Sequence, residues 1–69
     1  MDIRTQIGLN VKVARKVKGW SQEVLAFETS LHRTYISGIE RGIRNPTVTI
    51  ISRMAEALDL APADLLKKP

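Results

Sequence analysis

The residues of this sequence best suited to a chemical role are Arg33, Thr34 and Ser37. An arginine guanidinium can donate to O6 and N7 of one guanine at the same time, and short hydroxyl side chains can contact thymine methyl groups or base acceptors. Thr34 and Ser37 are three positions apart, so on a helix they share a face. The alternative for all three is a solvated helix surface. We favour contact with the edges of DNA bases.

Gly38 lies in the same segment and needs a separate explanation. Glycine inside a helix costs about 1 kcal/mol relative to alanine. One explanation is that the helix approaches the wall of a DNA groove closely at this point. The other is close packing within the protein. The sequence leaves both open, and Gly38 is kept among the predicted DNA-binding residues.

Two nearby residues suit contact with DNA phosphates. Gln22 begins a predicted helix, where its side chain and the free N–H groups of the first turn suit a phosphate oxygen. Tyr35 precedes an apolar residue, so its ring is expected at the edge of the core with its hydroxyl directed to a phosphate. The alternatives are simple helix formation for Gln22 and packing alone for Tyr35.

Two short helices joined by a tight turn must position these side chains. The first follows Ser21 as N-cap and runs to about Thr29, and the second covers about Arg33 to Arg41. We expect the small residue Ala26 where the two helices cross. The apolar residues Ile36 and Ile39 are expected on the buried side of the second helix. This build is that of a helix-turn-helix, which places its second helix in the DNA major groove.

Three more helices and no strands complete the prediction, a compact all-α domain of five helices over residues 1–69. Apolar residues at helical spacing and capping residues mark these helices. The first covers about Ile3 to Lys18, with the stripe Ile3, Ile7, Val11 and Ala14. Another begins after Thr47, with the stripe Val48, Ile51, Met54, Ala55 and Leu58. A short helix begins near Pro62 and carries Leu65 and Leu66.

Composition narrows the function classes. The chain has no cysteine and one histidine, so we expect no metal site, and no serine has the partners of a catalytic group; we expect no cofactor and no enzyme. No apolar run approaches the roughly 20 residues of a membrane span, and a cytoplasmic location is expected. The net charge is +4, and residues 1–46 hold eight Lys or Arg against four Asp or Glu. This imbalance favours a polyanionic partner such as nucleic acid.

Several short motifs resemble the lambda-repressor-like (Cro/repressor-type) helix-turn-helix family. They are Gly19-Trp20-Ser21-Gln22, Leu25-Ala26, Tyr35-Ile36-Ser37, Ile39-Glu40-Arg41-Gly42, Arg44-Asn45-Pro46 and Met54-Ala55-Glu56-Ala57-Leu58. The run from His32 to Arg41 is most similar to controller proteins of restriction–modification systems. The resemblance implies a homodimeric transcriptional regulator, such as a repressor or a controller, that binds a palindromic double-stranded DNA operator and is found on the nucleoid when bound.

The resemblance also implies roles for particular residues. The loop after the second helix of the helix-turn-helix should contact phosphates through Arg44, Asn45 and Thr47. A structural ion pair should join Arg15 and Glu40. The dimer interface should contain Leu60, Leu65 and Leu66. Two residues depart from the family pattern: Ser30 stands where glycine is common at the turn, and His32 replaces the usual Ser or Asp cap.

An alternative function is left open. An antitoxin-like adaptor would bind mainly a partner protein, and Leu9, Val13 and Val17 would then form its partner surface. Scattered exposed apolar residues, or cover for the last helix, are the simpler explanation of these three. A contact with RNA polymerase is likewise left open.

Overall fold

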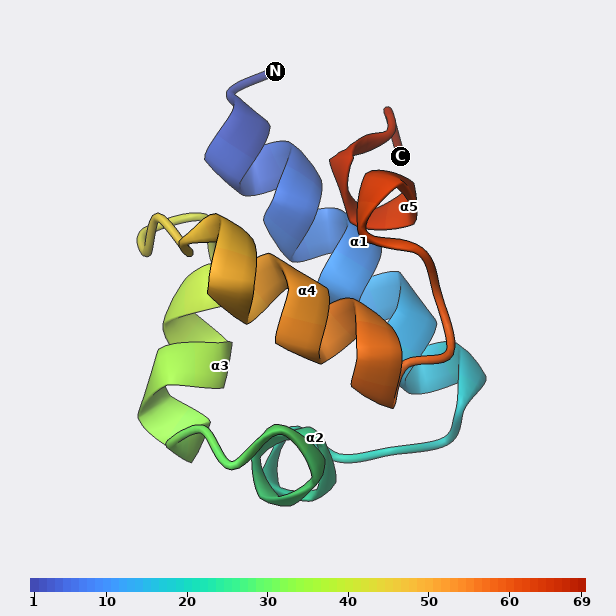
Figure 1. The fold of residues 1–69 in the computed structure, drawn as a ribbon. Helices are drawn as coiled ribbons and strands as arrows, with labels where there is room; N and C mark the ends of the chain where they lie inside the picture. The colour runs from blue at the N-terminus through green and yellow to red at the C-terminus, as the bar shows by residue number, and fades with distance from the viewer.

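The computed structural model describes residues 1–69 and is entirely helical, as predicted. Its five helices are α1 (Ile3–Val17), α2 (Gln22–Thr29), α3 (Arg33–Glu40), α4 (Val48–Ala57) and α5 (Pro62–Leu66). Figure 1 shows α3 along one side, α2 below it, and α5 against α1 at the end where both termini lie. None of these helices is both long and apolar enough to cross a bilayer.

Side-chain caps fix where the helices begin, because the first N–H groups of a helix have no partner within it. Side-chain oxygens of Asp2, Ser21 and Thr47 accept hydrogen bonds from first-turn N–H groups of α1, α2 and α4. His32 also caps its helix: its Nδ1 accepts from the Thr34 N–H at 3.1 Å. The unusual cap before α3 is therefore formed, with an imidazole nitrogen in place of a hydroxyl or carboxylate oxygen.

The C-terminal ends of α1 to α4 share one hydrogen-bond pattern. In each, a residue in the left-handed region follows the helix, and the next N–H bonds back to a carbonyl of the last turn. The four left-handed residues are Gly19 (φ 73°), Ser30 (φ 59°), Gly42 (φ 77°) and Asp59 (φ 59°). Ser30 therefore adopts the conformation that glycine usually supplies, so the turn keeps its shape without glycine.

The core lies between α1, α3, α4 and α5, with α2 closing it from below. The predicted Ala26, Ile36 and Ile39 are buried, and so are Leu25 and Leu65. Two members of the predicted stripes are exposed: Ile3 at 51% and Val48 at 81%. Each is the first residue of its helix, α1 or α4, and helical spacing alone assigned both wrongly to the core.

Helices α1 and α3 are in backbone contact at Gly8. A Cβ atom at this position would lie far inside van der Waals contact of the Ile39 carbonyl oxygen and 2.8 Å from the Glu40 carbonyl oxygen. Only glycine allows the two helices to approach this closely. The contact fixes the last turn of α3 against α1.

Candidate nucleic-acid interface

Packing against α1 and α2 gives α3 its orientation. Ile36 and Ile39 are 0% exposed, and α3 packs against both α1 and α2. On the other side of the same helix, Arg33 and Thr34 are exposed and Ser37 is half-buried. The structure therefore brings the three predicted base-reading residues onto one accessible surface of a helix that is fixed from below.

The predicted ion pair between Arg15 of α1 and Glu40 of α3 is present and buried. Arg15 Nε donates to Glu40 Oε2 at 2.7 Å and Arg15 Nη2 donates to Glu40 Oε1 at 2.9 Å. Arg15 Nη1 also donates to the Trp20 carbonyl oxygen at 2.8 Å. The hydrogen bonds with Glu40 raise the pKa of Arg15. This two-pronged contact couples the end of α3 to α1 and to the chain entering α2.

Gln22, predicted to contact phosphate, is tied to the same pair. Its Nε2 donates to Glu40 Oε1 at 3.1 Å. A side-chain amide has two N–H donors, so one remains for an outside acceptor. Gln22 is half-buried at the first position of α2. The contact with Glu40 was not predicted; it fixes the direction of an amide that stands beside the free N–H groups of α2.

The loop between α3 and α4 presents the other predicted phosphate contacts. Arg44, Asn45 and Thr47 are all exposed. Thr47 uses its hydroxyl to cap α4, accepting from the Ile50 N–H at 3.2 Å. The Arg44 guanidinium lies over the half-buried ring of Tyr35, 5.7 Å from its centroid. The loop thus extends the polar surface of α3 toward the N-terminus of α4.

Gly38 is buried beneath Arg44 rather than exposed on the surface. A Cβ atom at Gly38 would lie 2.6 Å from Arg44 Cγ, and its two next nearest atoms would also belong to Arg44. Of the two explanations for this glycine, the structure favours close packing within the protein.

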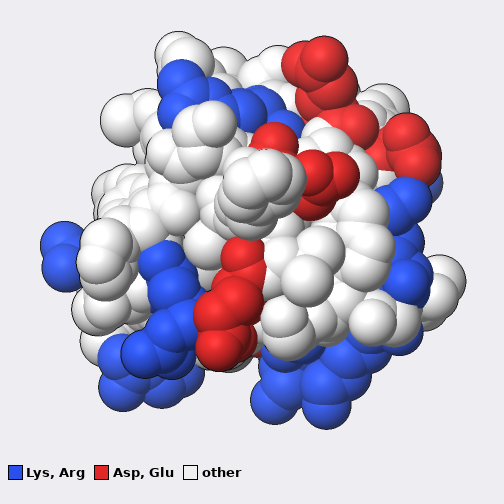
Figure 2. Space-filling model, turned by 90° about the horizontal axis from the view of Figure 1, so that it is seen from below, with Lys and Arg blue, Asp and Glu red and all other residues white.

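Three of the seven basic residues without a carboxylate partner lie in α3 or directly after it; the other four are Lys12, Lys16, Arg53 and Lys68. Four basic residues form ion pairs with carboxylates, namely Arg4, Arg15, Lys18 and Lys67. By contrast, Arg33, Arg41 and Arg44 are exposed and have no carboxylate partner. Figure 2, seen from the α2 side, shows Lys and Arg along the lower and outer edges of the molecule and Asp and Glu through the middle of this face. Arg41 is the C-cap of α3, and its Nε donates to the Ser37 carbonyl oxygen at 3.4 Å.

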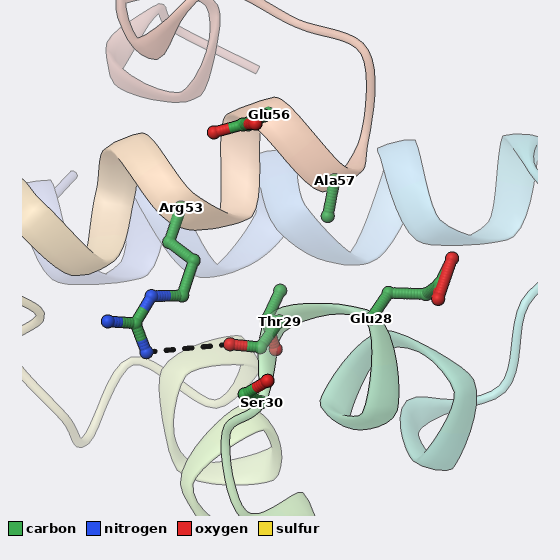
Figure 3. Close-up of a pocket in the computed structure, with 6 residues that line it drawn as sticks. All are labelled: Glu28, Thr29, Ser30, Arg53, Glu56 and Ala57. Atoms are coloured by element: carbon green, nitrogen blue, oxygen red, sulfur yellow. Dashed lines mark hydrogen bonds between the residues drawn. The ribbon is translucent and has the colours of Figure 1, made fainter.

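A shallow polar hollow separates α4 from the end of α2. Glu28, Thr29, Ser30, Arg53, Glu56 and Ala57 line it, and Arg53 Nη1 donates to the Thr29 carbonyl oxygen at 3.5 Å (Figure 3). The contact ties α4 to the last turn of α2 just before the turn into α3. The lining is mostly charged or hydroxylic, and Arg53 already reaches across it. We assign this hollow a structural role.

The predicted dimer residues do not share one environment. Leu65 is 0% exposed and packs in the core of its own protomer, so its prediction as an interface residue is wrong. The inner face of α5 packs on α1, and Asn10 Nδ2 donates to the Leu65 carbonyl oxygen at 2.9 Å. Leu66 is 44% exposed, and Leu60 is half-buried. These two remain available for a second copy.

The apolar stripe on α1 is interrupted. Leu9 is half-buried, whereas Val13 is 59% exposed and Val17 is 82% exposed. Val13 lies with Leu60 at the edge of a hollow beside α5. The two exposed valines are scattered apolar residues of the kind that many surfaces carry.

Comparison with known proteins agrees with this geometry. A helix-turn-helix family model matches residues 11–65. The chain is 50% identical over 66 residues to control protein C.BamHI of Bacillus amyloliquefaciens, across 94% of this chain and 82% of that protein. The structure of the restriction–modification controller protein C.AhdI from Aeromonas hydrophila has a TM-score of 0.87 at 42% identity, covering 90% of this chain and 94% of that chain. The structure of the biofilm regulator SinR in complex with DNA has a TM-score of 0.84 at 34% identity, covering 88% of this chain and 98% of that chain.

A fixed helix with an exposed polar face, flanked by exposed arginines without carboxylate partners, is typical of a DNA-binding domain. The chain belongs to the lambda-repressor-like helix-turn-helix family and is a DNA-binding transcriptional regulator. The fold and family predicted from the sequence are confirmed.

Proposed function

We propose that this regulator binds a palindromic operator as a homodimer and controls a restriction–modification operon from the cytoplasm, bound to the nucleoid. The observation that carries the proposal is α3, buried on one side and presenting Arg33, Thr34 and Ser37 on the other. The relatedness to C.BamHI supports the controller assignment. Two-fold symmetry places two copies of α3 in successive major grooves, about 34 Å apart.

The two kinds of contact have different tasks. Arg33, Thr34 and Ser37 read base edges, with the Arg33 guanidinium on a guanine. Residues at the margins of α3 hold phosphates and set the register, namely Gln22, Tyr35, Arg44, Asn45 and Thr47. The N-terminus of α4, capped by Thr47, adds free N–H groups to the same surface. Gly38 has no direct contact with DNA in this assignment.

Dimerisation supplies the second half-site. Leu66 and Leu60 near α5 provide apolar surface for a second copy. A domain of 69 residues has a small core, so burial between protomers would add stability. A contact between the bound dimer and RNA polymerase would allow the same regulator to activate as well as repress.

Selection of bound sequences from a random DNA pool tests this proposal. We expect enrichment of an inverted repeat with half-sites one helical turn apart, and two protomers per DNA by sedimentation. With six to ten phosphates contacted, the affinity should fall about 10³–10⁵-fold between roughly 50 and 200 mM salt. A single unpaired motif, or one protomer per DNA, would contradict the homodimer. Absence of any enriched sequence would contradict specific binding.

A further inference from the structure

Gly38 and Arg44 form a unit that the assignment of DNA contacts does not explain. The Arg44 side chain lies across α3 directly over Gly38, with Cγ, Nε and Cδ as the atoms nearest to an added Cβ, at 2.6, 3.4 and 3.5 Å. Its guanidinium then reaches the Tyr35 ring. Resting on the proposed function, we propose that Gly38 is a positioning residue, whose missing side chain allows Arg44 to lie along α3 and present its guanidinium to the DNA backbone.

The main chain supports this arrangement from the same residue. The Gly38 carbonyl oxygen accepts from the Ile43 N–H at 3.0 Å and from the Arg44 N–H at 3.2 Å. Gly42, with φ 77°, makes the reversal that brings these groups back to α3. Gly38 therefore fixes the backbone of Arg44 and also leaves room for its side chain.

A free arginine in a loop has many rotamers, and ordering one on binding costs affinity. Stacking on Tyr35 and packing on Gly38 order Arg44 before DNA arrives, without using a carboxylate that would compete with phosphate. The guanidinium N–H donors remain available for a phosphate oxygen. This is pre-organisation of a contact by a residue that does not itself touch DNA.

For Gly38→Ala the proposal predicts that stability and DNA binding change in different directions. Gly38 has no left-handed φ, so alanine suits the backbone and favours the helix. The obstacle to its Cβ is an exposed side chain that can rotate away at small cost to folding. We therefore expect a melting temperature at or above that of the wild type, together with weaker DNA binding.

Binding of the selected operator by wild type, Gly38→Ala, Arg44→Ala and the double variant tests the proposal. Arg44→Ala should weaken binding about 10- to 100-fold per half-site, the range for loss of a charged hydrogen bond to phosphate. Gly38→Ala should cause most of that loss, and the double variant should bind like Arg44→Ala alone. Gly38→Ala should also reduce the slope of log K against log salt by about 2 per dimer, one phosphate for each protomer.

Each other outcome has a distinct meaning. Wild-type affinity and salt slope in Gly38→Ala would overturn the proposal while leaving the proposed function intact. An equal loss from Gly38→Ala with and without Arg44 would also overturn it, because the Cβ would then obstruct the groove directly. Failure of the wild type to bind any DNA selectively would instead overturn the proposed function.

Nuclear magnetic resonance of the wild-type protein tests the position of Arg44 without any variant. Nuclear Overhauser contacts between the Gly38 Hα and the Arg44 side chain, with Arg44 side-chain protons shifted upfield by the Tyr35 ring, are expected in the free protein. Random-coil shifts for the Arg44 side chain and no such contacts would overturn the proposal.

Discussion

The two faces of α3 differ in burial and in the partners of their side chains. On the inner face, Ile36 and Ile39 are 0% exposed and Glu40 is 9% exposed, held by Arg15 and Gln22. On the outer face, Arg33 and Thr34 are exposed, and neither side chain has a hydrogen-bond or ion-pair partner within the protein. One helix of eight residues therefore separates two tasks. Changes on the inner face should affect folding first, and changes on the outer face should affect binding first.

The largest expected effect is that of Glu40→Ala. Its removal leaves the Arg15 guanidinium, 10% exposed, without a counter-charge. We expect a loss of about 3–5 kcal/mol in the free energy of unfolding, the usual cost of breaking a buried pair. Urea denaturation followed by circular dichroism measures it. Glu40→Gln keeps hydrogen-bonding groups and should lose less, and a loss below about 1 kcal/mol for Glu40→Ala would contradict the structural role of the pair.

Gly8→Ala should have the next largest effect, also on stability. The added methyl group meets the carbonyl oxygens of Ile39 and Glu40, which belong to the main chain and cannot rotate away. We expect a net loss of about 2–3 kcal/mol in the free energy of unfolding, typical of overpacking. Thermal denaturation of Gly8→Ala and Gly38→Ala compares an added methyl group that meets main-chain atoms with one that meets the Arg44 side chain. Equal stability of the two variants would mean that α1 and α3 separate more easily than their contact indicates.

Arg33→Ala tests the outer face. Because its side chain has no partner within the protein, the free energy of unfolding should change by no more than about 0.5 kcal/mol. Operator binding should lose about 1–3 kcal/mol per half-site, and the base pair read by Arg33 should become interchangeable. Binding to operator and to random DNA, measured side by side, separates contact with a base from contact with a phosphate. Equal losses on both would assign Arg33 to phosphate and leave base recognition to Thr34 and Ser37.

Ser30→Gly should have the smallest effect and an opposite sign. Ser30 has φ 59°, where a side chain is disfavoured and glycine is not. The gain is reduced by the greater freedom of glycine in the unfolded chain, so we expect about 0.5 kcal/mol of added stability. Operator affinity, measured by fluorescence anisotropy, should be unchanged, because the inner face and not the turn orients α3. Weaker binding with full stability would give the turn a part in that orientation.

The sequence determined the local features of this protein. The helix limits agree within about one residue, because capping and reversal depend on neighbouring residues: α1 ends at Val17 rather than Lys18, and α3 at Glu40 rather than Arg41. Residue type and helical spacing placed Arg33, Thr34 and Ser37 on the accessible surface of α3. The ion pair of Arg15 and Glu40 came from family resemblance, since 25 positions separate its members.

The tertiary structure alone decided which helix surfaces meet. Helical spacing assigned Ile3 and Val48 to the core, and family resemblance assigned Leu65 to a dimer interface; neither shows which neighbouring element covers a given side chain. The contact of Gln22 with Glu40 joins α2 to α3 and has no local signal. Gly8 and Gly38 are both glycines within helices, yet Gly8 faces main-chain carbonyl oxygens and Gly38 faces the Arg44 side chain. The physical reason is common to all of these: burial and contact depend on segments distant along the chain, and only folding brings them together.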